Sequence, residues 1–296
     1  MAKQSSESSD RPQLVARRST LAATLAAAAA IPAFVAAPKR AKAAQSGSST
    51  WEQIKSAGKV RMGIFNFPPY YSRDQKTGKW QGALVDMGED IAKQLKLNFE
   101  PVEIGGWDEV VLSLQANKID FHLGLQATPL RATAIYFAGP IYWIQWVTVN
   151  NPKFHGRTWA DYNHPNVKVA VQTGSSDALI LQLKAPQATR VQLQTLSEIV
   201  LAVSSGRADA FTTTVLASLV AKTKNPGLGD FVTPTPRVAL PGYAGIRMED
   251  DLRFQEFLNR WAEWNNMLGY NEQRMRGSLV QLGIKEIPPG ISFEQS

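Results

Sequence analysis

The stretch Val167–Ser176, with the sequence VKVAVQTGSS, indicates how this chain folds. Apolar residues recur at every second position up to Val171, a period of two that is typical of a β-strand. Gly174 and the two serines after it then supply a turn and the residue types that favour the start of a helix. A strand that passes through a tight turn into a helix is the repeating unit of an α/β fold.

The same alternation of strand and helix continues on both sides of this stretch. Strands are predicted at Lys59–Phe65, Ile119–Leu125, Gln145–Val149 and Ala208–Thr213, and helices at Ala83–Leu97, Asp108–Asn117, Ser197–Ser204, Asp251–Leu268 and Glu272–Leu282. Residues 225–241 are rich in Gly and Pro and are predicted to hold little regular structure. The sequence therefore predicts two α/β units within its 296 residues.

The net charge of +7 is concentrated at the N-terminus. Residues 1–43 contain seven basic and two acidic side chains, whereas the remaining 253 residues contain 25 basic and 23 acidic ones. A protein that binds nucleic acid by charge needs a basic face on its folded part. We therefore expect no nucleic-acid partner.

The chain contains no cysteine, which excludes disulfides, thiolate metal sites, a cysteine nucleophile and a lipid-modified cysteine. No metal-ligand spacing, phosphate-binding glycine loop or Ser/His/Asp order occurs either. We expect no metal, no cofactor and no catalytic residue.

Residues 1–43 have the pattern of a cleavable export signal. Arg17-Arg18 precede the uncharged, alanine-rich Leu21–Ala37, and a small-x-small site ends at Ala43. The paired arginines resemble a bacterial twin-arginine signal, although a general secretory signal stays an alternative. We expect a periplasmic protein whose mature chain begins near Ala44.

Six stretches resemble, in family order, the periplasmic solute-binding proteins of the polar amino acid ABC-importer family. They are Gly58–Gly63, Phe67–Tyr71, Gly78–Gly82, Thr128–Arg131, Gln172–Ser176 and Gly206–Ala210. The resemblance covers about residues 50–270 and implies a two-lobe α/β fold of the type II periplasmic binding protein kind, with a ligand cleft between lobes joined by two crossings. It implies lobe 1 at residues 44–148 and 242–296, lobe 2 at 149–241, and crossings near Val149 and Pro241–Ala244.

The resemblance also implies which lobe 1 residues hold the ligand. Arg131 matches the arginine that grips the ligand's carboxylate, and its guanidinium suits two parallel hydrogen bonds. Phe67 matches the aromatic residue that stacks on the ligand, and Trp107 a residue of the same wall. Three further residues match positions that contact the carboxylate: Gly124, Gln126 and Thr128.

On lobe 2, Ser175 and Ser176 stand at a predicted helix start, where free N–H groups favour an anion. One of these serines is alternatively a simple N-cap. Thr214 stands where amino-acid binders of the family present an aspartate for the α-ammonium. The ligand is therefore predicted to be either a carboxylate without that contact or an amino acid whose ammonium is held elsewhere.

The function predicted from the resemblance is solute capture for an ABC permease by a monomer that binds an amino acid or organic carboxylate. Two alternatives use the same fold. One is an enzyme resembling cyclohexadienyl dehydratases, for which His122 is the candidate acid or base. The other is a ligand sensor that docks onto a membrane receptor.

Overall fold

A computed structural model describes residues 48–285, which belong to one compact unit of the chain. The predicted export signal and the predicted start of the mature chain lie outside these residues. Within residues 48–285, no helix has the length and apolar character needed to cross a membrane.

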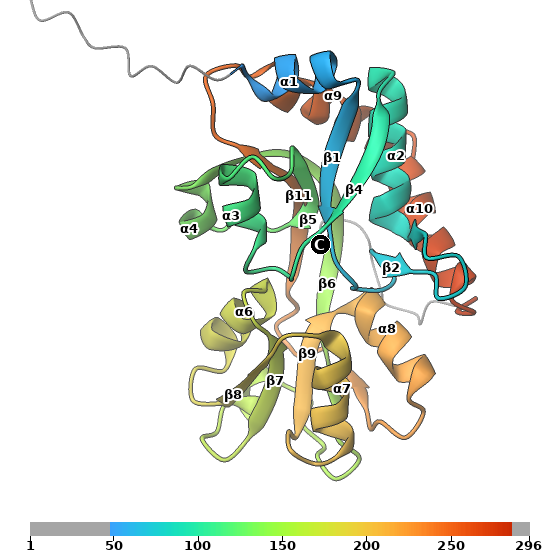
Figure 1. The fold of residues 1–296 in the computed structure, drawn as a ribbon. Coiled ribbons are helices and arrows are strands. Elements are labelled where there is room, and N and C mark those ends of the chain that lie inside the picture. Colours follow the sequence, from blue (N-terminus) through green and yellow to red (C-terminus); the bar gives the residue numbers. More distant parts are fainter. Residues whose placement is uncertain (1–47, 286–296) are drawn as a thin grey trace, which may run out of the picture. The chain divides into compact units, whose positions relative to one another are not determined.

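Strands and helices alternate along most of the described chain (Figure 1). The strands are β1 (Lys59–Ile64), β2 (Ser72–Arg73), β3 (Trp80–Gln81), β4 (Asn98–Glu103), β5 (Phe121–Leu125), β6 (Ile135–Asn150), β7 (Lys168–Gln172), β8 (Thr189–Leu193), β9 (Ala210–Thr214), β10 (Phe231–Val232) and β11 (Ala239–Arg247). The helices are α1 (Thr50–Ala57), α2 (Ala83–Leu95), α3 (Val110–Gln115), α4 (Pro129–Ala132), α5 (Trp159–Tyr162), α6 (Ser176–Lys184), α7 (Leu196–Ser204), α8 (Val215–Lys224), α9 (Arg253–Met267) and α10 (Tyr270–Gln281).

The strands follow the order β4-β1-β5-β11-β6-β9-β7-β8, with β10 also paired to β6. The first lobe contains β4, β1 and β5, and the second contains β9, β7 and β8. The long strand β6 continues from one lobe into the other: Ile135–Gln145 pair with β11, and Trp146–Asn150 pair with β9. The chain therefore crosses between lobes along β6 and returns along β11 (Figure 1). The two-lobe α/β fold is confirmed, and the lobe boundaries given above stay a prediction.

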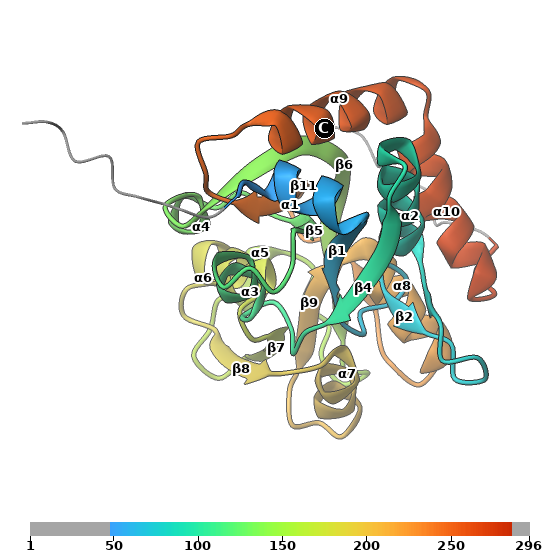
Figure 2. The same ribbon diagram turned by 45° about the horizontal axis from the view of Figure 1, so that its top comes forward.

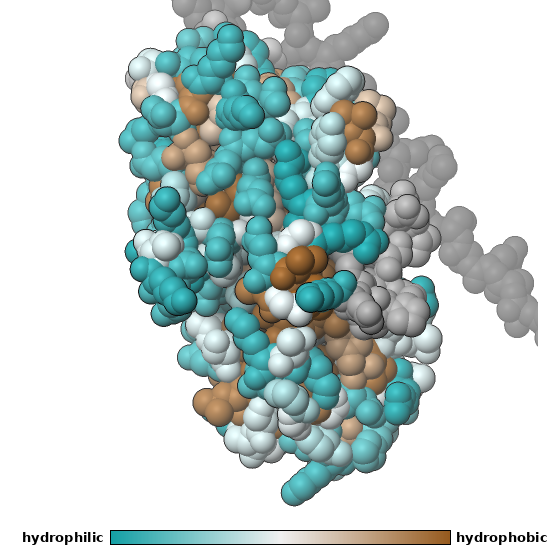
Figure 3. All heavy atoms as spheres, turned by 90° about the vertical axis from the view of Figure 1, so that its right-hand side faces the viewer, coloured by the Kyte–Doolittle hydropathy of each residue, from teal (hydrophilic) through white to brown (hydrophobic). Residues whose placement is uncertain are grey.

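Helices cover the sheet of each lobe. In the first lobe α9 packs on β6, while α2 packs on β4 and against α10 (Figure 2). The face shown in Figure 3 is covered mostly by hydrophilic residues, with hydrophobic residues gathered in a smaller area near its middle. Burial of the apolar face of α2, at positions such as Leu84, Met87 and Ile91, follows the spacing that predicted this helix.

One predicted strand is longer than expected. The strand predicted at Gln145–Val149 is the end of β6, which begins at Ile135. Residues 225–241 hold only the short β10 and the first three residues of β11, in agreement with the little regular structure predicted there. Pro241 and Gly242 fit inside β11 because its pairing with β6 is irregular between Gly242 and Ala244, and the ring of Tyr142 packs against Gly242.

Candidate functional site

A cavity lies between the two lobes, with an empty volume, including its mouth, of about 340 Å³. The first lobe and β6 contribute Phe67, Tyr70, Leu84, Trp107, Gly124, Gln126, Tyr142 and Trp146, and the second lobe contributes Ser175, Ser176, Asp177 and Thr214. Seven of the nine residues predicted to bind a ligand line it. Its enclosed space is only about 20 Å³, room for about one water molecule, so a larger ligand would need the lobes to part.

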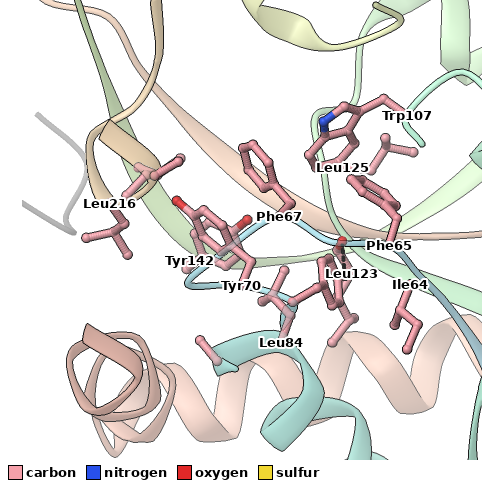
Figure 4. Close-up of a cluster of buried hydrophobic side chains, with 14 of the residues drawn as sticks. Ile64, Phe65, Phe67, Tyr70, Leu84, Trp107, Leu123, Leu125, Tyr142 and Leu216 are labelled. Carbon is pink, nitrogen blue, oxygen red and sulfur yellow. Dashed lines mark hydrogen bonds between the residues drawn. The ribbon is translucent and has the colours of Figure 1, made fainter. Parts of the chain in front are cut away.

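Phe67, Tyr70, Trp107 and Tyr142 lie together in one cluster (Figure 4), and these aromatic residues form a wall of the cavity that they line. The rings of Phe67 and Tyr70 stack with centroids 5.5 Å apart, and Trp107 meets Phe67 edge to face at 5.4 Å. Tyr70 stacks in turn on Tyr142, at 6.2 Å. Such rings offer a flat apolar surface together with hydroxyl and N–H groups. The Trp107 Nε1–H donates to Gln172 Oε1 of the second lobe at 3.2 Å, so this wall also contacts the opposite lobe.

Arg131 reaches across the cleft beside the cavity. Its Nη1 donates to the Gln126 carbonyl oxygen at 3.1 Å and to Ser176 Oγ at 3.3 Å, and its Nη2 donates to the Gly174 carbonyl oxygen at 2.8 Å. Burial lowers the pKa of Arg131 to about 10, and the charge of Asp177 opposes that shift. Arg131 is thus a cation at neutral pH that contacts both lobes, although it does not itself line the cavity.

The residues that hold Arg131 in place come from two turns. Thr128 is the N-cap of α4 and accepts a hydrogen bond from the Arg131 backbone N–H at 3.2 Å. It positions Arg131 and does not line the cavity. Gln126 lines the cavity, and its Oε1 accepts from Ser176 Oγ at 2.9 Å. The structure therefore brings Arg131, Gln126 and Ser176, which were predicted to bind an anionic ligand group, into one hydrogen-bonded group.

The two serines have different structural roles. Ser175 is the N-cap of α6: its Oγ accepts from the Asp177 backbone N–H at 3.2 Å and donates to the Gln172 carbonyl oxygen at 2.6 Å. Ser176 instead faces the first lobe through Gln126 and Arg131. The alternative interpretation as an N-cap describes Ser175.

Gly124 and Thr214 both line the cavity. Gly124 has φ +82°, and a Cβ there would lie 2.8 Å from Leu84 Cδ1 and from the Tyr142 hydroxyl, so a side chain at this position would be crowded. Thr214 Oγ1 accepts from the Tyr70 hydroxyl at 3.0 Å, across the two lobes.

Asp177 is a cavity residue that the sequence prediction missed. It is 4% exposed, and its Oδ1 accepts from Trp146 Nε1 at 2.6 Å. Burial raises its pKa to about 6, whereas hydrogen bonds such as that from Trp146 and the charge of Arg131 act in the opposite direction. The sequence signal for Asp177 is its place directly after Ser175-Ser176, but an acidic residue in a first helical turn usually serves the helix alone.

His122 is buried behind the aromatic wall and does not line the cavity. It stacks on Phe65 with ring centroids 5.8 Å apart. Its Nδ1–H donates to the Gly63 carbonyl oxygen at 2.8 Å, and its Nε2 is buried without a hydrogen-bond partner in the part of the chain that the structure describes. Burial lowers the pKa of His122 to about 4, so the ring is neutral at pH 7.

This buried histidine gives stability a specific pH dependence. The folded-state pKa of about 4 lies below the ordinary value of 6.5. Between pH 6.5 and pH 4, His122 is therefore protonated in the unfolded chain but neutral in the folded chain. Stability therefore falls as pH falls through 6.5, and this effect levels off below 4. Between pH 7 and pH 5, the unfolding free energy of the wild type should fall by about 2 kcal/mol more than that of His122→Gln. Urea unfolding at several pH values measures the difference, and parallel profiles would contradict it.

Residues 60–188 match the family described as bacterial extracellular solute-binding proteins, family 3. No curated protein matches the chain. Among solved structures, the ancestral amino acid-binding protein AncCDT-1, described as a precursor of cyclohexadienyl dehydratase, is 25% identical with a TM-score of 0.68, over 79% of this chain and 99% of that chain.

Two further structures are similar. Holo ArgBP from T. maritima is 25% identical with a TM-score of 0.66, over 73% of this chain and 93% of that chain. The solute receptor for L-cysteine of Neisseria gonorrhoeae is 19% identical with a TM-score of 0.72, over 82% of this chain and all of that chain, and at this identity it shows the fold alone. Residues 60–188 thus match bacterial solute-binding protein family 3, and the described chain has the type II periplasmic binding protein fold.

Proposed function

We propose that the protein is the extracytoplasmic solute-binding component of an ABC importer, and that it captures an amino acid or a related small organic carboxylate by closure of its lobes. The observation that carries this proposal is the position of Arg131. Its guanidinium contacts the Gln126 carbonyl of the first lobe and the Gly174 carbonyl of the second, beside a cavity with an aromatic wall. A ligand carboxylate entering here would accept charge-assisted hydrogen bonds from the guanidinium alongside these protein oxygens, because a guanidinium carries five N–H donors.

Lobe closure is supported by the kind of contact that joins the lobes at the cavity. Tyr70 to Thr214, Trp107 to Gln172 and Arg131 to Ser176 are hydrogen bonds between polar groups, at 3.0 to 3.3 Å. Such bonds are readily exchanged for bonds to water or to a ligand. With β6 and β11 as the two crossings, opening about a hinge would admit the ligand and closing would bury it.

The periplasmic location and the permease partner belong to the same proposal. They are supported by the family description, which is of extracellular solute-binding proteins, and by the export pattern of residues 1–43. The protein acts in this scheme as a monomer without cofactor, metal or catalytic residue. It makes and breaks no covalent bond.

A ligand screen tests the proposal. Differential scanning fluorimetry of the purified protein against the standard amino acids and a panel of organic carboxylates should give at least one compound that raises the melting temperature, because a ligand that binds only the folded state stabilises it. Uptake of that compound should fall in cells that lack the gene. Binding without an effect on uptake would favour a sensor, and consumption of a cyclohexadienyl carboxylate would favour the enzyme.

A further inference from the structure

We propose that Asp177 is the counter-charge for a cationic nitrogen of the ligand, so that the cavity takes a zwitterion with Arg131 at its carboxylate and Asp177 at its ammonium group. This inference rests on the proposed function, because it names the ligand class of the same cavity. It selects the second of the two ligand predictions left open by the neutral Thr214, namely an amino acid whose ammonium is held elsewhere.

The carboxylate of Asp177 is buried at the cavity with few partners. Trp146 Nε1–H is the one group in the described chain that donates a hydrogen bond of standard geometry to it, at 2.6 Å. The hydroxyls of Ser175 and Thr213 lie near enough to lower its pKa, but no side-chain nitrogen of Lys or Arg within residues 48–285 lies within 4.0 Å of its oxygens. Asp177 is therefore a buried acid without a close cation.

Burying an acid in this way is costly for the folded protein. A carboxylate removed from water is destabilised unless a cation or several donors replace the lost hydration. The raised pKa of Asp177, about 6, is the direct consequence. An ammonium group bound in the cavity would supply the absent positive charge. Relief of the desolvation penalty of Asp177 would then add to the binding free energy of a cationic ligand.

Two other acids in the chain show what a purely structural acid at a helix start does. Asp161 of α5 and Glu198 of α7 are exposed, and each closes a capping box by accepting from the backbone N–H of its own N-cap residue. Those hydrogen bonds lower the pKa of both carboxyls. Asp177 differs in every respect, since it is buried, its side chain bonds a tryptophan of β6, and its pKa is raised. A helix-capping role does not account for it.

The arrangement of charges suits a small zwitterion. Ser176, which accepts from Arg131, directly precedes Asp177, and the guanidinium beside the cavity and the carboxylate that lines it are close enough to act on each other electrostatically. The Asp177 carboxylate acts to raise the pKa of Arg131, and the Arg131 guanidinium acts to lower the pKa of Asp177, as expected for nearby opposite charges. The two nevertheless form no ion pair within 4.0 Å in the described chain, which leaves both able to face a ligand.

The test compares matched ligands on matched variants. The probes are the strongest-binding standard amino acid and the same acid with its ammonium replaced by hydrogen, titrated calorimetrically near pH 7.5. Asp177→Asn keeps the shape and an acceptor for Trp146, and it should weaken the amino acid about 30-fold or more while leaving the deaminated acid within about threefold. Asp250→Asn, at an exposed acid that does not line the cavity, is the control and should leave both affinities within about threefold.

The outcomes separate this inference from the proposed function. If Asp177→Asn weakens both probes equally, or neither, Asp177 does not recognise an ammonium group and the inference is wrong while capture of a carboxylate stands. If no standard amino acid binds the wild type but a carboxylate without nitrogen does, the inference is likewise overturned. If no compound binds at all, the proposed function fails with it.

A second readout needs no ligand. Above pH 6 the wild type holds an ionised Asp177 at a cost, so unliganded Asp177→Asn should melt at a higher temperature than the wild type near pH 8. The difference should shrink towards pH 4, where the carboxyl is protonated in the folded protein. A lower melting temperature for the variant near pH 8 would assign Asp177 a structural role and overturn the inference.

Discussion

Replacing Arg131 by methionine is expected to weaken binding of a carboxylate ligand by about 30-fold or more, since truncating one partner of a buried charge pair costs about 2 to 5 kcal/mol. Methionine keeps the length of the apolar stem and removes every donor. The guanidinium is the one cationic group that contacts both lobes beside the cavity within residues 48–285, so no second cation there replaces it. Calorimetric titration with the strongest ligand of the screen measures the loss.

Two controls define the cause of that loss. Arg131→Lys keeps the charge but lacks the planar fork, and we expect an intermediate affinity because an ammonium cannot form two parallel bonds to one carboxylate. Arg157→Met removes an exposed arginine of the second lobe, paired with Asp230 at 3.0 Å, and should leave the affinity unchanged. If Arg131→Met binds within about threefold of the wild type, the carboxylate is held elsewhere and the proposed function loses its main support.

Local sequence patterns predicted the elements whose residues bury a regular apolar face. The spacing of Leu84, Met87 and Ile91 defines α2, and the alternation that begins at Val167 defines β7. The edge strands β4 and β8 were missed because most of their residues are only partly buried, so hydrogen bonding to a neighbouring strand and not a hydrophobic pattern determines them.

The residues of the candidate site that lie in recognisable sequence motifs could be predicted. Arg131 and Ser176 come from distant motifs, and the fold brings them within hydrogen-bond distance. Asp177 was missed because its chemistry depends on burial against Trp146, which is 31 residues earlier in the chain and on the crossing strand. Whether an acid at a helix start is exposed or buried is a tertiary property that no local pattern contains.

Replacing Gly174 by alanine is expected to weaken ligand binding about 10- to 100-fold by holding the lobes apart. Gly174 has φ +70°, and a Cβ there would lie 2.7 Å from the Asp108 backbone nitrogen of the opposite lobe. Because this contact is with backbone, relieving it requires one of the two segments to move. The Gly174 carbonyl oxygen accepts from Arg131, so the same displacement would pull that acceptor away. Each misplaced hydrogen bond to a charged group costs about 1.5 to 3 kcal/mol, which corresponds to the expected range of affinities.

Gly206→Ala is the matched control, because Gly206 has φ +76° but nothing within 4 Å of its added Cβ. Both variants should lose about 1 to 2 kcal/mol of stability from the left-handed backbone, whereas only Gly174→Ala should lose affinity. Small-angle X-ray scattering with saturating ligand should then give a larger radius of gyration for Gly174→Ala than for the wild type and Gly206→Ala. Equal affinities for the two variants would mean that ligand binding does not require the close approach of Gly174 to Asp108, and lobe closure would have to use a different contact.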